Sequence, residues 1–292
     1  MKKVIATIAA IGCLSAAGVA LAGIEAGTGI NGSLHDMTLV VGPTADSMGR
    51  VCVFCHTPHH AAVTTNTDQL PLWNHTMTDD SQFTAYTWAT PLNVQATIDD
   101  PLAGPSRLCM SCHDGSIAID QHGKAMAENG TTKIDTLNTG MDGVGRANLT
   151  KDLSNTHPIG FNYNTIEAAR NADANLRASK NAAGTTNYGA EIVKSSNKYA
   201  SAIDTNQAAG TYNVVTRDAS GKRIQDNLFG GDIMTCATCH EVHNKENATQ
   251  VAWAASKTLT LGGGVTKTQT APNYFLYAKE DKSLICLSCH VK

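Results

Sequence analysis

The chain has few of the residues that usually build a protein core. Aromatic residues make up only 5% of its 292 residues, and Leu, Ile, Val and Phe are sparse for this length. After the N-terminal segment, no stretch reaches the roughly 18 to 20 continuous apolar residues of a membrane-spanning helix. The formal charge of −3 disfavours nucleic acid as a partner. The sequence therefore predicts no membrane span, no nucleic-acid binding and a side-chain core that is small for the chain.

The N-terminal segment has the parts of a secretory signal peptide. Lys2 and Lys3 form the charged region, and an apolar run follows that ends at Ala20-Leu21-Ala22. We expect residues 1–22 to be removed and the protein to be exported to the cell surface or the extracellular space, with the periplasm as the alternative. Lipoprotein-type cleavage at Cys13 is the competing interpretation.

The other eight cysteines form four CxxCH motifs. On one helical turn, residues i, i+3 and i+4 share a face, so two thiols can bond to the porphyrin vinyl groups while the imidazole binds the iron. This is the attachment signature of a c-type haem. A zinc site or a disulfide is the alternative for one isolated pair, but neither requires a histidine after every pair. The sequence therefore predicts four haem c groups, held by Cys52, Cys55 and His56, by Cys109, Cys112 and His113, by Cys236, Cys239 and His240, and by Cys286, Cys289 and His290.

The predicted haems explain how a chain with few aromatic and large aliphatic residues can fold. Each porphyrin has two large apolar faces, and burying them replaces the aliphatic cluster that would otherwise offset chain entropy. Gly, Asn, Thr and Asp are dense outside the motifs, and hydrophobic periodicity is weak. We therefore expect a multihaem cytochrome c fold of mostly irregular coil, with short helices at the haem sites and a haem stack as core.

The spacing of the motifs indicates an internal duplication. Successive motifs begin 57, 127 and 50 residues apart. The first and third carry a second histidine three residues after the proximal one, whereas the second and fourth read CMSCH and CLSCH. We infer haem module 1 at residues 23–160 and haem module 2 at residues 231–292.

An insertion at residues 161–230 separates the two modules and contains no cysteine. Its polar, alanine-rich stretches predict helices over residues 165–183 and 190–204. Residues 212–226 predict a hairpin.

Each iron needs a sixth ligand if it is to carry electrons without binding a substrate. Seven histidines lie outside the motifs, so the supply exceeds the four that are needed. Methionine is the alternative and would raise the reduction potential; the candidates are Met37, Met77, Met126 and Met141. The surplus of histidine favours four bis-histidine haems.

The candidate distal ligands differ in their local sequence. His59 and His243 occupy equivalent places, three residues after a proximal histidine. His75 lies in an apolar-flanked run, and His157 precedes a run that we expect to be buried. His35 has a neighbouring carboxylate, Asp36, which either orients its ring or pairs with it on the surface. His60 competes with His59, and the surroundings of His122 are typical of a solvated turn.

The chain resembles the tetrahaem surface cytochromes of metal-reducing bacteria that polymerise into extracellular filaments. The resemblance covers blocks in residues 34–160 and 236–290 and not the insertion from about 162 to 230. It rests on Leu34-His35-Asp36, Cys55-His56-Thr57-Pro58-His59-His60, Pro71-Leu72-Trp73-Asn74-His75, Leu108-Cys109-Met110-Ser111-Cys112-His113-Asp114-Gly115, Asp152-Leu153-Ser154-Asn155-Thr156-His157-Pro158 and Cys239-His240-Glu241-Val242-His243-Asn244.

This resemblance implies long-range electron conduction along stacked haems, with a histidine of one subunit bound to a haem of the next. If His243 reaches from module 2 to a haem of module 1, the equivalence of the two CHxxH turns sends His59, or His60 in its place, to a haem of another copy. Such an interface is head-to-tail and propagates into a polymer. Redox partner cytochromes and extracellular electron acceptors are the other expected partners.

Two other functions stay open. A monomeric periplasmic or surface shuttle would use the same four haems. A multihaem oxidoreductase would need an iron with an open position, and no motif has a lysine in place of the proximal histidine. We therefore expect an electron carrier and not an enzyme.

Overall fold

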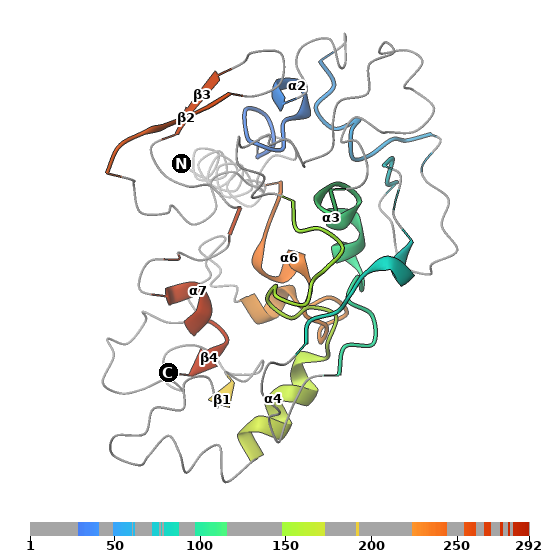
Figure 1. The fold of residues 1–292 in the computed structure, drawn as a ribbon, viewed down its shortest axis with the longest axis vertical. Helices are drawn as coiled ribbons and strands as arrows, with labels where there is room; N and C mark the ends of the chain where they lie inside the picture. The colour runs from blue at the N-terminus through green and yellow to red at the C-terminus, as the bar shows by residue number, and fades with distance from the viewer. Residues whose placement is uncertain are drawn as a thin grey trace, which may run out of the picture.

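A computed structural model describes residues 29–40, 49–59, 61, 72–75, 77, 79–87, 97–115, 148–172, 191–192, 224–243, 254–260, 266–269, 275–276, 280 and 283–291. Most of these residues lie in turns and extended segments between short helices and strands (Figure 1). The helices are α2 (Met37–Val40), η1 (Asp80–Gln82), α3 (Pro105–His113), α4 (Tyr163–Ala172), η5 (Ile224–Asn227), α6 (Cys236–Cys239) and α7 (Leu284–Leu287). The strands are β1 (Glu191–Ile192), β2 (Lys257–Thr260), β3 (Thr266–Gln269) and β4 (His290–Val291). Within the described ranges, no helix is both long enough and apolar enough to cross a membrane.

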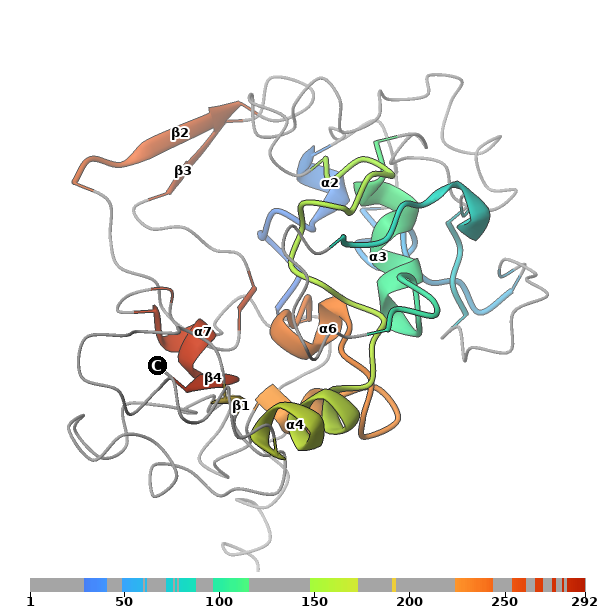
Figure 2. The ribbon, with the colours of Figure 1, turned by 60° about the horizontal axis from the view of Figure 1, so that its bottom comes forward.

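Helix α3 packs against α6 near the centre of the molecule, and α4 lies next to them (Figures 1 and 2). Helix α3 starts after Gly104, whose φ of 53° is one that residues with a side chain rarely adopt, and Pro105 occupies its first turn. A Cβ at Gly104 would lie 2.7 Å from the ring of Phe229, so glycine also allows the close approach of the segment before α6.

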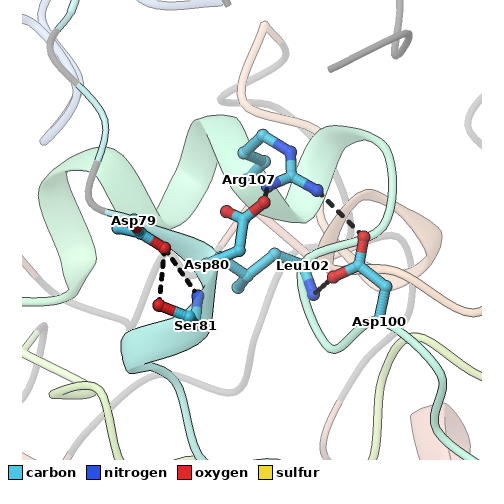
Figure 3. A network of polar contacts seen from close by, with 6 residues as sticks. All are labelled: Asp79, Asp80, Ser81, Asp100, Leu102 and Arg107. Atoms are coloured by element: carbon cyan, nitrogen blue, oxygen red, sulfur yellow. Dashed lines mark hydrogen bonds and ion pairs between the residues drawn. The ribbon is translucent and has the colours of Figure 1, made fainter. Parts of the chain in front are cut away.

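A buried cation holds two loops to α3 (Figure 3). Arg107, with 3% of its side chain exposed, forms ion pairs with Asp80 and, at 2.9 Å, with Asp100. The second carboxylate oxygen of Asp100 accepts a hydrogen bond of 2.8 Å from the backbone N–H of Leu102. Arg107 therefore connects η1 and the turn before α3 to the helix that carries the second haem motif.

Among the described residues, buried apolar side chains form two small clusters. One combines the start of α4 with β1 and the segment before α6; its buried members are Phe161, Tyr163, Ile166, Ile192, Leu228 and Met234. The other lies under α3 and consists of Leu102, Met110 and Leu153. Backbone hydrogen bonds from Gly160 to Met234 (2.8 Å) and from Met234 to Phe161 (3.0 Å) join the start of α4 to the α6 region.

The structure corrects two predictions made for the insertion. The helix predicted over residues 190–204 is wrong at Glu191–Ile192, which form strand β1 and pair antiparallel with His290–Val291. The second strand of the hairpin predicted over residues 212–226 is wrong at its end, where Ile224–Asn227 form a 3-10 helix that contacts α6. In both places, tertiary contacts with module 2 override local propensity.

The helix predicted over residues 165–183 begins earlier, at Tyr163, and its described part runs to Ala172. The remaining residues of these three predictions lie outside the described chain.

One hairpin was not expected from the sequence. Strands β2 and β3 pair antiparallel from Lys257 opposite Gln269 to Thr260 opposite Thr266. The hairpin lies apart from α3, α4 and α6 in both views (Figures 1 and 2). The alternating sequence before a run of three glycines, Gly262 to Gly264, is the signal that could have predicted it.

Candidate haem-binding sites

All four CxxCH motifs form one turn of helical or helix-like backbone. Residues 109–113 lie on α3, and Cys236–Cys239 form α6. In the first motif the N–H of His56 donates to the carbonyl of Cys52 at 2.9 Å, and in the third the N–H of His240 donates to that of Cys236 at 3.0 Å. In the fourth, α7 contains Cys286, and the N–H of Cys289 donates to its carbonyl at 3.1 Å. The residue before the second cysteine is buried in every motif: Phe54, Ser111, Thr238 and Ser288.

Among the described residues, His113, His56 and His290 each lie near a second histidine. The ring centres are 6.0 Å apart for His113 and His35, 6.2 Å for His56 and His243, and 6.5 Å for His290 and His157. The planes of the His56 and His243 rings differ by 30°, whereas those of the other two pairs differ by 68° and 70°. The His56–His243 pair joins haem module 1 to haem module 2.

These separations agree with the geometry of two imidazoles bound to one iron. Bonds between a metal and an imidazole nitrogen are about 2.0–2.1 Å long, and the ring centre lies about 1.1 Å behind that nitrogen, so the two centres are about 6.3 Å apart. The observed separations of 6.0, 6.2 and 6.5 Å are close to this value. The residues therefore fit a six-coordinate haem at three of the four motifs.

One ring in each of two pairs contacts an aromatic side chain. The ring of His56 meets Trp73 edge-on at 5.5 Å, and the ring of His35 lies 4.6 Å from Phe275. Burial, and next the nearby His113, lower the pKa of His35 to about 3, so its imidazole is neutral and has a lone pair for a metal.

Asp36 does not orient His35, which was one of the two roles predicted for it. Its carboxylate accepts hydrogen bonds from the backbone N–H groups of Gly32 (2.8 Å) and Thr38 (3.1 Å) instead. Asp36 is buried, so it does not pair with His35 on the surface either. It stabilises the turn that carries His35 into the interior.

The other histidines divide by exposure. His75 is fully buried, at 0% exposure, whereas His59 is exposed in the turn after the first motif. His157 lies partly at the surface, yet desolvation lowers its pKa. His60 and His122, and the alternative ligands Met126 and Met141, lie outside the described residues. Met37 is buried at the start of α2.

Cysteines of successive motifs are neighbours. The Cys109 thiol donates to the sulfur of Cys236, which lowers the pKa of Cys236 to about 7 and raises that of Cys109. The adjoining backbone is fixed by a 3.1 Å hydrogen bond from the N–H of Cys236 to Oγ of the buried Ser106. The second and third attachment sites therefore share a boundary between α3 and α6.

Two other cysteines lie near a cysteine of another motif, whose charge affects their pKa. Burial, and next the nearby Cys55, raise the pKa of Cys112. Burial, and next the nearby Cys289, raise the pKa of Cys239. The four attachment sites thus follow one another in the order of the sequence, first to second, second to third and third to fourth.

Among the described residues, no group of three or more His, Cys, Asp or Glu side chains is arranged to hold a bare metal ion. A haem iron takes only two protein ligands, so pairs of imidazoles are the relevant pattern. No protein-family model matches the chain, and no curated protein matches it.

Proposed function

We propose that this protein transfers electrons through four covalently held c-type haems with histidine on both sides of each iron. The observation that carries the proposal is the spacing of the three histidine pairs, which agrees with imidazoles on opposite sides of one iron. The ligand residues are far apart in sequence, up to 187 positions for His56 and His243. Their meeting at this spacing has no evident purpose in a protein without haem.

When bound, haem supplies a one-electron iron couple and an apolar ring through which electrons leave and enter. The chain supplies the rest. The two imidazoles of each pair would hold the iron in both oxidation states and would leave it no free position for a substrate. Trp73 and Phe275 are buried and cover one side of the His56 and His35 rings.

The order of the attachment sites supports a continuous path for electrons. Because Cys55 lies near Cys112, Cys109 near Cys236, and Cys239 near Cys289, no attachment site is isolated from the next. The bond from Cys236 to Ser106 fixes the central boundary, where the path passes from module 1 to module 2.

The local geometry of the two CHxxH turns supports assembly into a filament. In module 2, an oxygen of Glu241 accepts the backbone N–H of His243 (3.1 Å), and in module 1, Oγ1 of Thr57 accepts that of His59 (3.4 Å). The two turns are therefore alike and both histidines are exposed, but the ring of His243 also lies opposite His56 of the other module. His243 of module 2 lies opposite the proximal histidine of the first haem in module 1. If His59 of module 1 has the same relation to module 2 of another copy, it binds the haem of His240 in that copy.

The ligand of the fourth iron distinguishes a filament from a monomeric shuttle. His35, His157 and His243 supply three distal ligands within the chain. In a filament the fourth comes from His59 of a neighbouring copy, and in a shuttle it comes from within the chain, where the buried His75 is the candidate. His59→Ala then abolishes assembly and leaves one high-spin iron per chain, whereas His75→Ala does neither.

The experiment for the function as a whole is to purify the secreted protein and measure its haem content, the spin state of the iron and its size. We expect four covalent haems per chain and four low-spin irons. Negative-stain microscopy should show filaments, while elution as a single chain, 30.7 kDa before processing, would indicate the shuttle. Fewer than four haems, or an iron that is high-spin in the assembled protein, would contradict the proposal of four bis-histidine sites.

A further inference from the structure

We propose that Glu241 lowers the reduction potential of the first haem by acting on its distal ligand, His243. The inference rests on the proposed function, because it takes His56 and His243 as the ligands of one iron. It adds a tuning residue that lies in module 2 and acts on a haem attached to module 1.

One oxygen of the Glu241 carboxylate contacts both ends of His243. Oε1 accepts the backbone N–H of His243 at 3.1 Å and lies 3.2 Å from its ring Nδ1. Glu241 itself has 13% of its side chain exposed, against 53% for His243. Its own backbone N–H donates to the carbonyl of the buried Phe275 at 2.8 Å, so the carboxylate is held in place. Contact through Nδ1 leaves Nε2 of His243 for the iron.

A carboxylate behind a ligand imidazole makes that imidazole a stronger electron donor. Nδ1–H donates to the carboxylate, and the partial negative charge on the ring increases electron density at Nε2. Since ferric iron carries one more positive charge than ferrous iron, the stronger donor favours the ferric state. The proton stays on Nδ1 in both states, and the electron comes from the titrant.

In the described part of the chain, Nδ1 of neither of the other two distal histidines contacts a carboxylate. Nδ1 of His157 lies 3.0 Å from the carbonyl oxygen of Pro158, which is a neutral acceptor. Nδ1 of His35 is buried and has no hydrogen-bond partner among the described residues. Among the three histidine pairs of the described chain, the contact of Glu241 is therefore specific to the His56–His243 pair.

Module 1 contains a natural comparison. Thr57 holds the place that Glu241 holds in module 2, and its hydroxyl accepts only the backbone N–H of His59, at 3.4 Å. Thr57 also donates to the carbonyl of His59 at 2.6 Å. A single hydroxyl is thus enough to hold this turn. The carboxylate of Glu241 is not needed for the turn itself, which leaves its contact with the ring as the additional function.

The experiment is a spectropotentiometric titration of the haem-loaded full chain with two substitutions of Glu241. Glu241→Gln keeps an oxygen acceptor for both N–H groups and removes the charge. Glu241→Thr introduces the residue found at this place in module 1. A threonine can hold the turn but does not reach the imidazole ring. Glu280→Gln, at an exposed glutamate of the same module, is the control for loss of one negative charge.

We expect one of the four one-electron components to shift upward in both Glu241 variants. The ratio of ferrous to ferric iron in that component should rise about tenfold at a fixed potential, which is about 59 mV. All four irons should stay low-spin in the Glu241 variants. In a protein that already has His243→Ala, adding Glu241→Gln should cause no further shift. Glu280→Gln should leave all four components in place.

Two results would overturn the inference. One is an unchanged titration of Glu241→Gln in a protein with four low-spin haems. The other is an equal shift in Glu280→Gln, which would show that overall charge is responsible. A parent protein without four low-spin haems would instead contradict the proposed function, so the two failures are distinguishable.

Discussion

The pairing of His56 with His243 can be tested by counting irons in single and double variants. The rings of the two histidines are 6.2 Å apart and belong to different modules. If they bind the same iron, His243→Ala converts one iron in four to the high-spin state. The double variant with His56→Ala then affects no further iron, because both substitutions act on the same site.

The structure also indicates that these variants fold. The side chain of His243 is 53% exposed, and its contacts with Glu241 are local, so the loss of packing costs less than about 1 kcal/mol. The larger loss is the link between modules. Loss of the histidine pair does not separate the modules, because they also meet between α3 and α6. There, the backbone N–H of Cys236 donates a hydrogen bond to Oγ of Ser106.

The assay is integration of the high-spin and low-spin ferric signals by electron paramagnetic resonance, with haem content from mass spectrometry. His35→Ala combined with His243→Ala is the control and should affect two irons, since His35 faces His113 instead. If His56→Ala prevents attachment of the first haem, the double variant should still have three haems and no additional high-spin iron. A His243→Ala protein with four low-spin irons, or a His56/His243 double variant that loses two irons, would refute the pairing.

Three further predictions follow from the same structure. The planes of the His56 and His243 rings differ by 30°, so the iron between them should give a rhombic low-spin resonance. Nearly parallel imidazoles separate the energies of the iron d orbitals more than rings whose planes differ by 68° or 70°. Identical spectra from all three irons would contradict this prediction. Gly160→Ala should destabilise the protein by about 2–4 kcal/mol in denaturant unfolding, because Gly160 has a φ of 79° and a Cβ there would collide with the carbonyl of Asp100. The control is Gly32→Ala. Gly32 has a similar φ of 73°, but a Cβ there would have no atom within 4 Å, so this substitution should cost less. Arg107→Met should lower the free energy of unfolding by about 1–3 kcal/mol, because it removes a buried cation from two carboxylates. The loss is limited because the two carboxylates are 43% and 41% exposed. An unfolding midpoint equal to that of the wild type would refute this prediction.

Local patterns in the sequence predicted which residues attach the haems and which could serve as ligands. The CxxCH spacing follows from the geometry of one helical turn, so it can be read without knowing the fold. The equivalence of His59 and His243 is likewise a local feature, and it extends to the turns that hold them. In contrast, the helix predicted at Glu191–Ile192 was wrong because those residues pair with β4 from the other end of the chain.

Only the tertiary structure brings the histidines into pairs. His35, His157 and His243 lie 78, 133 and 187 positions from the proximal histidines that they face, and no local pattern specifies which of seven histidines meets which motif. The same holds for Glu241 as a residue that acts on the first haem, because that role depends on His243 crossing between modules. Sequence alone determines the chemistry of each attachment site, since that chemistry is contained in five consecutive residues. The path between sites depends on packing, because it is formed by residues that meet only when the chain folds.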